Sequence, residues 1–138
     1  MNTIAWASDP APGLAPVQPA VSMNWTDEDT ILRVVLRGDL SVEDVTRLDS
    51  QVYEALAAKP KCKAVIFDVQ NAGRVSPHLM QLRMKRGYPR NHSLEYICIA
   101  GEHRLLRLIL ILTYTSGAAS IQFFRDVDVA VKFVNKPL

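Results

Sequence analysis

Apolar and polar positions alternate along the chain in two different periods, and each period predicts a different kind of element. Residues 31–36 (Ile-Leu-Arg-Val-Val-Leu) are mostly apolar and rich in β-branched side chains, which is typical of a strand covered on both faces. Four further short runs also predict strands. The predicted strands are Val21–Thr26, Thr30–Leu36, Ala64–Val69, Leu94–Ala100 and Ser120–Phe124.

Turn-forming residues set the predicted ends of these strands. Asp27-Glu28-Asp29 predicts a turn between the first two strands, and Gly38 marks the exit from the second. Asn71-Ala72-Gly73 predicts a turn after the third strand, and Gly101 ends the fourth. Asp68 then stands near the carboxyl end of the third strand, where open α/β sheets bind ligands.

Four segments between or after the strands predict amphipathic helices. Ser41 is expected to cap the first helix in an imperfect capping box with Asp44, and Lys59-Pro60-Lys61 ends it. A second helix is expected over Pro77–Arg86 with Ser76 as N-cap. The third is expected over His103–Tyr114 with Gly117 as C-cap, and the fourth begins after Asp126. The expected buried stripes are Val45, Leu48, Val52 and Leu56 in the first helix, and Val127, Ala130, Val131 and Val134 in the last.

Strands that alternate with helices imply parallel neighbours joined by right-handed crossovers. We therefore predict an α/β fold with a mixed, mostly parallel sheet of four to five strands and about four helices. The 138 residues, 49% of them hydrophobic, suffice for one domain with one core. Two cysteines are too few for a disulfide scaffold or a thiolate zinc site.

The first 20 residues differ in composition from the rest. They hold Pro10, Pro12, Pro16 and Pro19 and lack the basic and apolar regions of a secretory signal. We expect a flexible Pro-rich tail over 1–20 and the domain over 21–138, with translation from Met23 as the open alternative. The apolar run Leu105–Leu112 is too short to span a membrane, so we expect a cytoplasmic protein.

No familiar catalytic or metal-binding motif occurs in the sequence. His78, His92 and His103 lack helical metal-site spacing, and neither cysteine belongs to a Cys-x-x-Cys motif. Ser76 and His78 are two positions apart at a helix start, so they point in different directions. Cys98 is expected to be a small core residue. We therefore predict a protein that is not an enzyme and needs no cofactor or metal.

The net charge of +2 conceals an uneven distribution. Residues 27–54 are mainly acidic, whereas no acid occurs between Asp68 and Glu95. The basic residues in that second segment are Arg74, Arg83, Lys85, Arg86 and Arg90. This segment is either a solvated helix face or a docking patch for an acidic partner. Similarly, Ser76 is either a simple N-cap or part of a helix start that favours a phosphate.

Several stretches, taken in order, resemble STAS domains (sulphate transporter and anti-sigma factor antagonist). They are Thr30–Ser41 with its following helix, Val65–Val69, Thr115–Gly117, and Ile121–Phe124 before the Asp126-capped helix. The sequence is also similar to a divergent bacterial STAS-like group whose second helix opens with a proline motif, here Val75-Ser-Pro-His78. The resemblance covers about Val21–Val134 and implies a single STAS-like domain.

The resemblance implies a protein-interaction module without catalysis of its own. In anti-sigma factor antagonists, a partner kinase phosphorylates a Ser or Thr at the start of the second helix, in an Asp-Ser-Ser-Gly-like motif, and this abolishes binding. Counted from the strand, Ser76 falls at the Asp, Pro77 at the first Ser, His78 at the acceptor and Leu79 at the Gly. The acceptor hydroxyl is present only if a two-residue shift brings Ser76 into its place.

The leading hypothesis is a STAS-like regulatory protein that binds a kinase or an anti-sigma-like protein through the second helix and its entry loop. The candidate switch and partner-binding residues are Ser76, His78, Arg74, Arg83 and Arg86. A homodimer stays open. The alternative is a carrier or sensor of a small apolar or lipid-like ligand, lined by Leu105–Leu112 and Tyr114. Nucleic-acid binding is least favoured, because Tyr88 is the one aromatic in the basic segment that could stack on bases.

Overall fold

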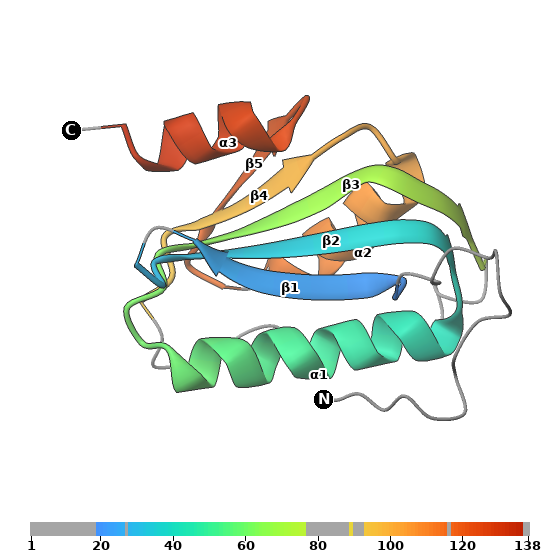
Figure 1. The fold of residues 1–138 in the computed structure, drawn as a ribbon, viewed down its shortest axis with the longest axis horizontal. Helices are drawn as coiled ribbons and strands as arrows, with labels where there is room; N and C mark the ends of the chain where they lie inside the picture. The colour runs from blue at the N-terminus through green and yellow to red at the C-terminus, as the bar shows by residue number, and fades with distance from the viewer. Residues whose placement is uncertain (1–18, 27, 77–88, 90–92, 116, 137–138) are drawn as a thin grey trace, which may run out of the picture.

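The computed structural model of the chain describes residues 19–26, 28–76, 89, 93–115 and 117–136 (Figure 1). The elements are β1 (Val21–Thr26), β2 (Ile31–Leu40), α1 (Val42–Ala58), β3 (Ala64–Val75), β4 (Tyr96–Ala100), α2 (Arg104–Tyr114), β5 (Ser120–Phe124) and α3 (Val127–Val134). The strands form one five-stranded sheet in the order β1-β2-β3-β4-β5. Only the β1–β2 pair is antiparallel, so the predicted mixed, mostly parallel α/β sheet is confirmed.

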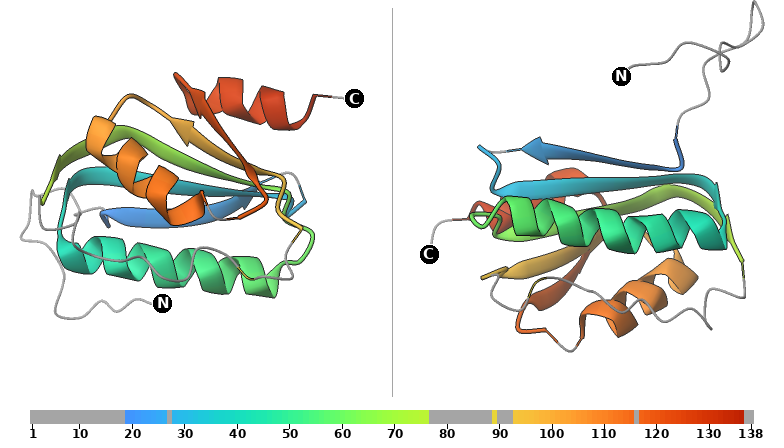
Figure 2. Two further views of the ribbon diagram at one scale, coloured as in Figure 1. Left: turned by 180° about the vertical axis from the view of Figure 1, so that it is seen from behind. Right: turned by 90° about the horizontal axis from the view of Figure 1, so that it is seen from below.

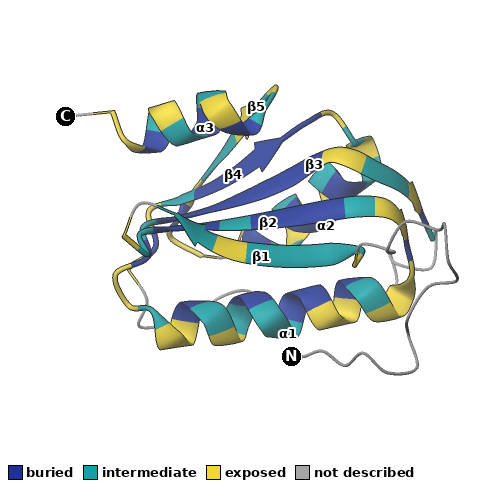
Figure 3. Ribbon diagram, in the orientation of Figure 1, coloured by how far each residue is buried: buried dark blue, intermediate teal, exposed yellow. Residues whose placement is uncertain are grey.

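The two faces of the sheet carry separate hydrophobic clusters. The larger cluster lies between the sheet and helices α1 and α2, whereas the smaller one lies between the sheet and α3 (Figures 1 and 2). Burial on both faces explains why β2, β3 and β4 are so apolar, and these strands are the most deeply buried elements (Figure 3). Cys98 belongs to the smaller cluster, which confirms its expected role as a core residue.

The first helix forms as its sequence predicts. The Ser41 hydroxyl accepts the backbone N–H of Asp44 at 3.1 Å, and the Asp44 carboxylate accepts the N–H of Ser41 at 2.8 Å. The capping box is therefore complete, and it satisfies two N–H groups at the helix start. All four residues of the predicted apolar stripe are buried: Val45, Leu48, Val52 and Leu56.

The last two described helices also begin near the expected residues. Asp126 caps α3 by accepting the N–H of Val129 at 2.9 Å. In the stripe of α3, Val127, Ala130 and Val134 are buried, whereas Val131 is half-buried. The expected C-cap of α2 at Gly117 is wrong, because the helix ends at Tyr114 and Thr115 is its C-cap, with a backbone N–H that donates to the carbonyl of Ile111.

Two strands run further than their turn-forming residues predict. Gly38 lies inside β2 with φ +64, and Asn71-Ala72-Gly73 lies inside β3 rather than in a turn. The parallel β2–β3 register shifts between Val35 and Arg37 and again between Gly38 and Leu40, so bulges absorb these residues within the ladder. β4 begins at Tyr96, two residues later than predicted.

The helix expected over 77–86 and most of the Pro-rich tail lie outside the described residues. The described part of the chain contains three helices rather than the predicted four or so. None of these three is long and apolar enough to cross a membrane.

Candidate functional site

The candidate site lies where β3 ends and Ser76 follows. Val75 is buried and pairs with Leu40 of β2, whereas Arg74 is exposed and Ser76 is half-buried. Arg74 and Ser76 therefore both lie at the carboxyl end of β3, on either side of the buried Val75. The other predicted site residues, His78, Arg83 and Arg86, lie outside the described residues.

A bulge fixes the backbone just before Ser76. Gly73 and Arg74 of β3 lie opposite Asp39 of β2, between the pairs Gly38–Ala72 and Leu40–Val75. The Asp39 Oδ1 atom accepts the backbone N–H of Arg74 at 2.8 Å. A side chain at Gly73 would place its Cβ 2.5 Å from the same oxygen. Glycine is therefore favoured at this position, because any side chain would displace the Asp39 carboxylate or press on the backbone of Gly38.

His103 joins this edge to the start of α2. Its Nδ1 atom accepts the backbone N–H of Leu106 at 3.3 Å, which caps the helix. Since Nδ1 acts as an acceptor, Nε2 carries the proton and donates it to the carbonyl of Gly73 at 2.7 Å. The imidazole thus holds the end of β3 against α2.

Sequence patterns alone did not reveal the roles of Asp39 and His103. Asp39 and Arg74 are 35 positions apart, so no local motif connects them. The N-cap position of His103 could have been recognised from the helix boundary, because side chains that accept hydrogen bonds are favoured there. Its contact with Gly73, 30 positions away, depends on the tertiary fold.

Some of the charged residues near this edge serve the structure itself. The Arg107 Nε atom donates to the carbonyl of Gly101 at 2.9 Å, and its guanidinium lies 5.0 Å from the ring centroid of Phe123. In the acidic segment, Asp29 pairs with Lys59 at 3.0 Å. Arg74 and Arg104 are exposed at the edge that also holds Ser76.

Asp68 is not at the end of its strand as predicted, because β3 continues to Val75. The residue is 4% exposed and its Oδ2 atom pairs with Arg33 Nη2 at 3.3 Å. Its Oδ1 atom accepts the backbone N–H of Gln70 at 3.1 Å. Asp68 therefore stabilises the middle of the sheet.

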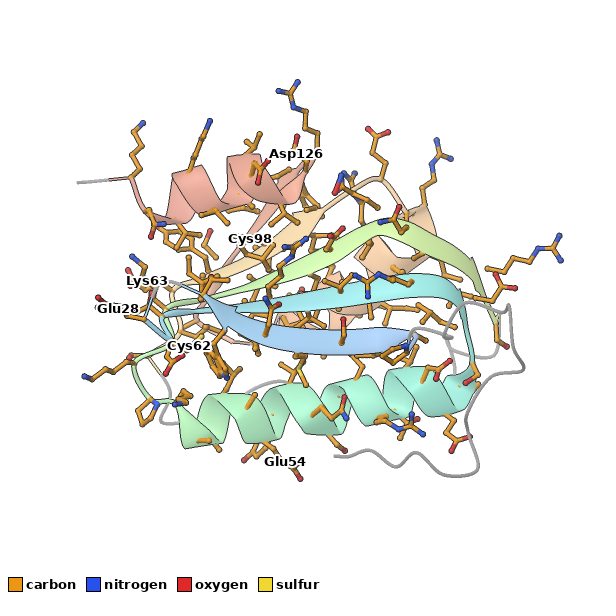
Figure 4. The ribbon with its side chains drawn as sticks, viewed as in Figure 1. Glu28, Glu54, Cys62, Lys63, Cys98 and Asp126 are labelled. Carbon is orange, nitrogen blue, oxygen red and sulfur yellow. The ribbon has the colours of Figure 1, made fainter. Side chains whose placement is uncertain are left out.

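The buried thiols are not placed for nucleophilic chemistry. Burial raises the pKa of Cys62 to about 11 and that of Cys98 to about 12, so both are protonated at neutral pH. Figure 4 shows Cys62 before β3 and Cys98 on β4. Among the residues that the structure describes, no three His, Cys, Asp or Glu side chains form a group that could hold a metal ion.

The apolar helix suggested for ligand binding fills the core with its inner face. Tyr114 is 1% exposed, and its ring centroid lies 5.5 Å from that of Phe67. Burial, with the nearby Asp49 carboxylate, raises the pKa of this tyrosine above its ordinary range. A groove of about 150 Å³ lies instead on the opposite face of the sheet. It is lined by Thr26, Ile31, Arg33, Ile66, Val127, Asp128 and Val131.

Comparison with solved structures identifies the fold. The chain is similar to the protein SpoIIAA, described as an anti-sigma factor antagonist in its unphosphorylated form, with a TM-score of 0.59 and 10% identity over 86% of this chain and 100% of that one. It is also similar to an uncharacterised protein of the DUF3478 family from Shewanella loihica PV-4, described as having a SpoIIAA-like fold. Here the TM-score is 0.54, with 20% identity over 83% of this chain and 91% of that one. No family model and no curated protein matches the sequence.

These similarities confirm the predicted fold class. The chain has a SpoIIAA-like, STAS-like α/β fold along most of its length. At identities of 10% and 20%, the relation rests on the arrangement of strands and helices and not on shared site residues.

Proposed function

We propose that the chain is a non-enzymatic regulatory module that acts by binding another protein through the edge of the sheet around Ser76. The structurally similar SpoIIAA is described as an anti-sigma factor antagonist in its unphosphorylated form, which motivates a switch based on phosphorylation. We propose a partner of the kinase or anti-sigma class and a cytoplasmic setting. His78, Arg83 and Arg86 are further proposed contacts, since they follow Ser76 closely in the sequence.

The observation that carries this proposal is the fixed backbone on which Ser76 follows β3. Asp39 binds the N–H of Arg74, and His103 binds the carbonyl of Gly73, so two tertiary hydrogen bonds hold the residues just before the serine. A docking surface gains affinity when its groups are ordered before binding, because less entropy is lost. Among the described residues, Ser76 is therefore the one that we favour as the phosphorylated switch residue.

Phosphorylation of Ser76 would change the charge of this edge sharply. A phosphate adds about −1.5 to −2 charges at neutral pH. The exposed Arg74 lies two residues before it, where it can compensate part of the new charge. A partner that docks on Arg74 and Arg104 through an acidic surface would then be repelled.

Affinity capture tests the proposal with the full chain as bait in a lysate of the source organism. The baits are the wild type, Ser76→Asp and Ser76→Ala. The matched control is Ser93→Asp, because Ser93 is exposed and lies before β4, at the opposite edge of the sheet. Recovered proteins are quantified by mass spectrometry.

We expect a partner that the wild type, Ser76→Ala and Ser93→Asp retain equally and that Ser76→Asp recovers at least about tenfold less. Equal recovery by all four baits would remove Ser76 from the proposed interface. Failure of every bait to retain a specific protein would contradict the interaction module itself.

The groove on the α3 face favours a second candidate, the binding of a small apolar molecule. Its volume of about 150 Å³ equals that of a cavity known to accept benzene. Ile31, Ile66, Val127 and Val131 supply an apolar lining. Native mass spectrometry of the purified chain tests this candidate, and spectra that contain the bare chain alone would count against it.

A further inference from the structure

Within the part of the chain that the structure describes, β1 forms an edge of the sheet that lacks the usual protection. In the sheet order it has one neighbour, β2, and in Figure 2 no described element lies beyond it. Its sequence, Val-Ser-Met-Asn-Trp-Thr, contains no charge and no proline, and its register with β2 has no bulge. Charged side chains, prolines and bulges usually protect the edges of natural sheets, because an open edge pairs readily with another strand.

The register shows which backbone groups of β1 face outward. Arg37 donates its N–H to the carbonyl of Ala20 at 2.8 Å, so these two opposite residues form a hydrogen-bonded pair. Hydrogen-bonded and non-hydrogen-bonded pairs alternate along antiparallel strands. Ser22, Asn24 and Thr26 therefore bond to β2, whereas Val21, Met23 and Trp25 direct their N–H and C=O groups to the open edge.

The three outward residues also share one face. The side chains of Val21, Met23 and Trp25 pack against the larger hydrophobic cluster, yet all three remain partly exposed. Each therefore combines backbone groups that face away from β2 with apolar surface that the described residues do not fully cover. The edge offers main-chain hydrogen bonds and an apolar row to the same neighbour.

We propose that this neighbour is the β1 strand of a second copy, paired antiparallel about a two-fold axis at Met23. In that register Met23 faces its own counterpart, and Val21 faces Trp25 of the partner. Each of these pairs exchanges two backbone hydrogen bonds. On the other face, Ser22 lies opposite the partner's Asn24. Because β1 carries no charge, the pairing brings no like charges together within the strands.

A second copy fits this edge better than an unrelated peptide does, because the outward row is its own complement. In the symmetric register the large Trp25 lies opposite the smaller Val21 of the partner subunit, and Met23 lies on the two-fold axis. The two copies therefore contribute the same residues to the interface. One short strand pair buries less than roughly 1,200 Å², the lower limit of stable interfaces. An interface of this size belongs to the weak, transient class of associations.

Sedimentation velocity of the full chain tests the proposal between about 5 and 500 µM, a range in which weak association is populated. Met23→Lys places two like charges on the axis, and Met23→Glu does the same with the opposite sign. Each variant should weaken dimerisation at least about tenfold, whereas an equimolar mixture of the two should restore it. The control Asn24→Glu adds the same charge as Met23→Glu one residue away, opposite Arg33 of its own β2 and Ser22 of the partner subunit, and should change the Kd less than about threefold.

Amide hydrogen exchange of the wild type gives a readout that needs no variant. The outward amides of Val21, Met23 and Trp25 should exchange more slowly as concentration rises, whereas the inward amides of Ser22 and Asn24 should not change. A wild type that stays monomeric at every concentration overturns the proposal. So does a Lys–Glu mixture that associates no better than either variant alone.

Discussion

The Asp39 Oδ1 atom accepts a hydrogen bond from the backbone N–H of Arg74 at 2.8 Å, although 35 positions separate the two residues in the sequence. This bond satisfies a backbone N–H that the bulge in β3 removes from the regular ladder. It also fixes the residues that lead to Ser76. The proposed switch thus depends on a contact between the ends of two neighbouring parallel strands.

Gly73→Ala should lower the free energy of unfolding of the protein by about 1–2 kcal/mol. The new Cβ would lie 2.5 Å from Asp39 Oδ1 and 3.1 Å from the carbonyl carbon of Gly38. The carboxylate must then move and release the N–H of Arg74. Urea unfolding followed by circular dichroism measures the change in free energy.

A double-mutant cycle separates the steric clash from other effects of alanine. In an Asp39→Ala background, Gly73→Ala should cost about half as much or less, because the clashing oxygen is absent. The control Gly38→Ala also strains the chain, through its φ of +64, but its Cβ would meet nothing within 4 Å. Equal costs of Gly73→Ala in both backgrounds would show that Asp39 does not set the requirement for glycine.

The fold could be predicted largely from local patterns. The apolar runs identify all five strands, and Ser41 with Asp44 identifies the start of α1, because both signals lie within a few residues. The ends of β2 and β3 could not be predicted in this way. Gly38 and Asn71–Gly73 are typical of turns, yet pairing between the two strands keeps them in the ladder through bulges.

The candidate site could be predicted only in part for the same reason. Ser76 and Arg74 were identified because a proline and a cluster of basic residues follow them in the sequence. Asp39 and His103 were not identified as site residues, since their partners are Arg74 and Gly73 on another part of the chain. Tertiary hydrogen bonds leave no periodic signal in a single sequence.

Arg33→Met should destabilise the protein by about 1–3 kcal/mol, less than for a fully buried pair because Arg33 is partly exposed. The side chains of Arg33 and Asp68 are 40% and 6% exposed, so the change leaves a buried carboxylate without its cation. The loss of unfolding free energy caused by Arg33→Met should be smaller in an Asp68→Asn background.

The control Arg47→Met removes an exposed pair with Glu43 and should lower the free energy of unfolding by less than about 0.5 kcal/mol. Urea unfolding of the five proteins tests these values, and an Arg33→Met cost that Asp68→Asn leaves unchanged would refute the coupling.

His103→Ala should lower stability by about 1–2 kcal/mol, because it removes both the cap of α2 and the bond to Gly73. His103→Asn should restore the cap alone, since asparagine is among the best N-cap residues. Amide exchange at Leu106 should therefore accelerate in the alanine variant and recover in the asparagine variant.

Ser41→Ala is the matched control, because it removes the cap of α1 without touching α2. It should accelerate exchange at Asp44 and leave Leu106 unchanged. If the asparagine variant recovered full stability as well as the slow exchange of Leu106, the bond between His103 and Gly73 would contribute nothing to the fold.

Stability should decline in alkaline solution because of the two buried thiols. In the folded chain the pKa of Cys62 is raised from 9.0 to about 11 and that of Cys98 from 9.0 to about 12. The unfolded chain loses these protons first, so above pH 9 it binds fewer protons than the folded chain, and rising pH favours unfolding. Each thiol contributes up to about 1.4 kcal/mol per pH unit until its folded pKa is reached.

Urea midpoints measured from pH 7 to pH 11 test this prediction. The urea midpoint of the Cys62→Ala/Cys98→Ala variant should decline less steeply above pH 9 than that of the wild type. Between pH 7 and pH 8 the two midpoints should change in parallel, because the thiols are protonated in both the folded and the unfolded state. Burial also raises the pKa of Tyr114, so part of the decline should remain in the variant. Identical slopes above pH 9 would mean that the thiols are not protected by the core, because only a difference in pKa between the folded and unfolded states couples them to stability.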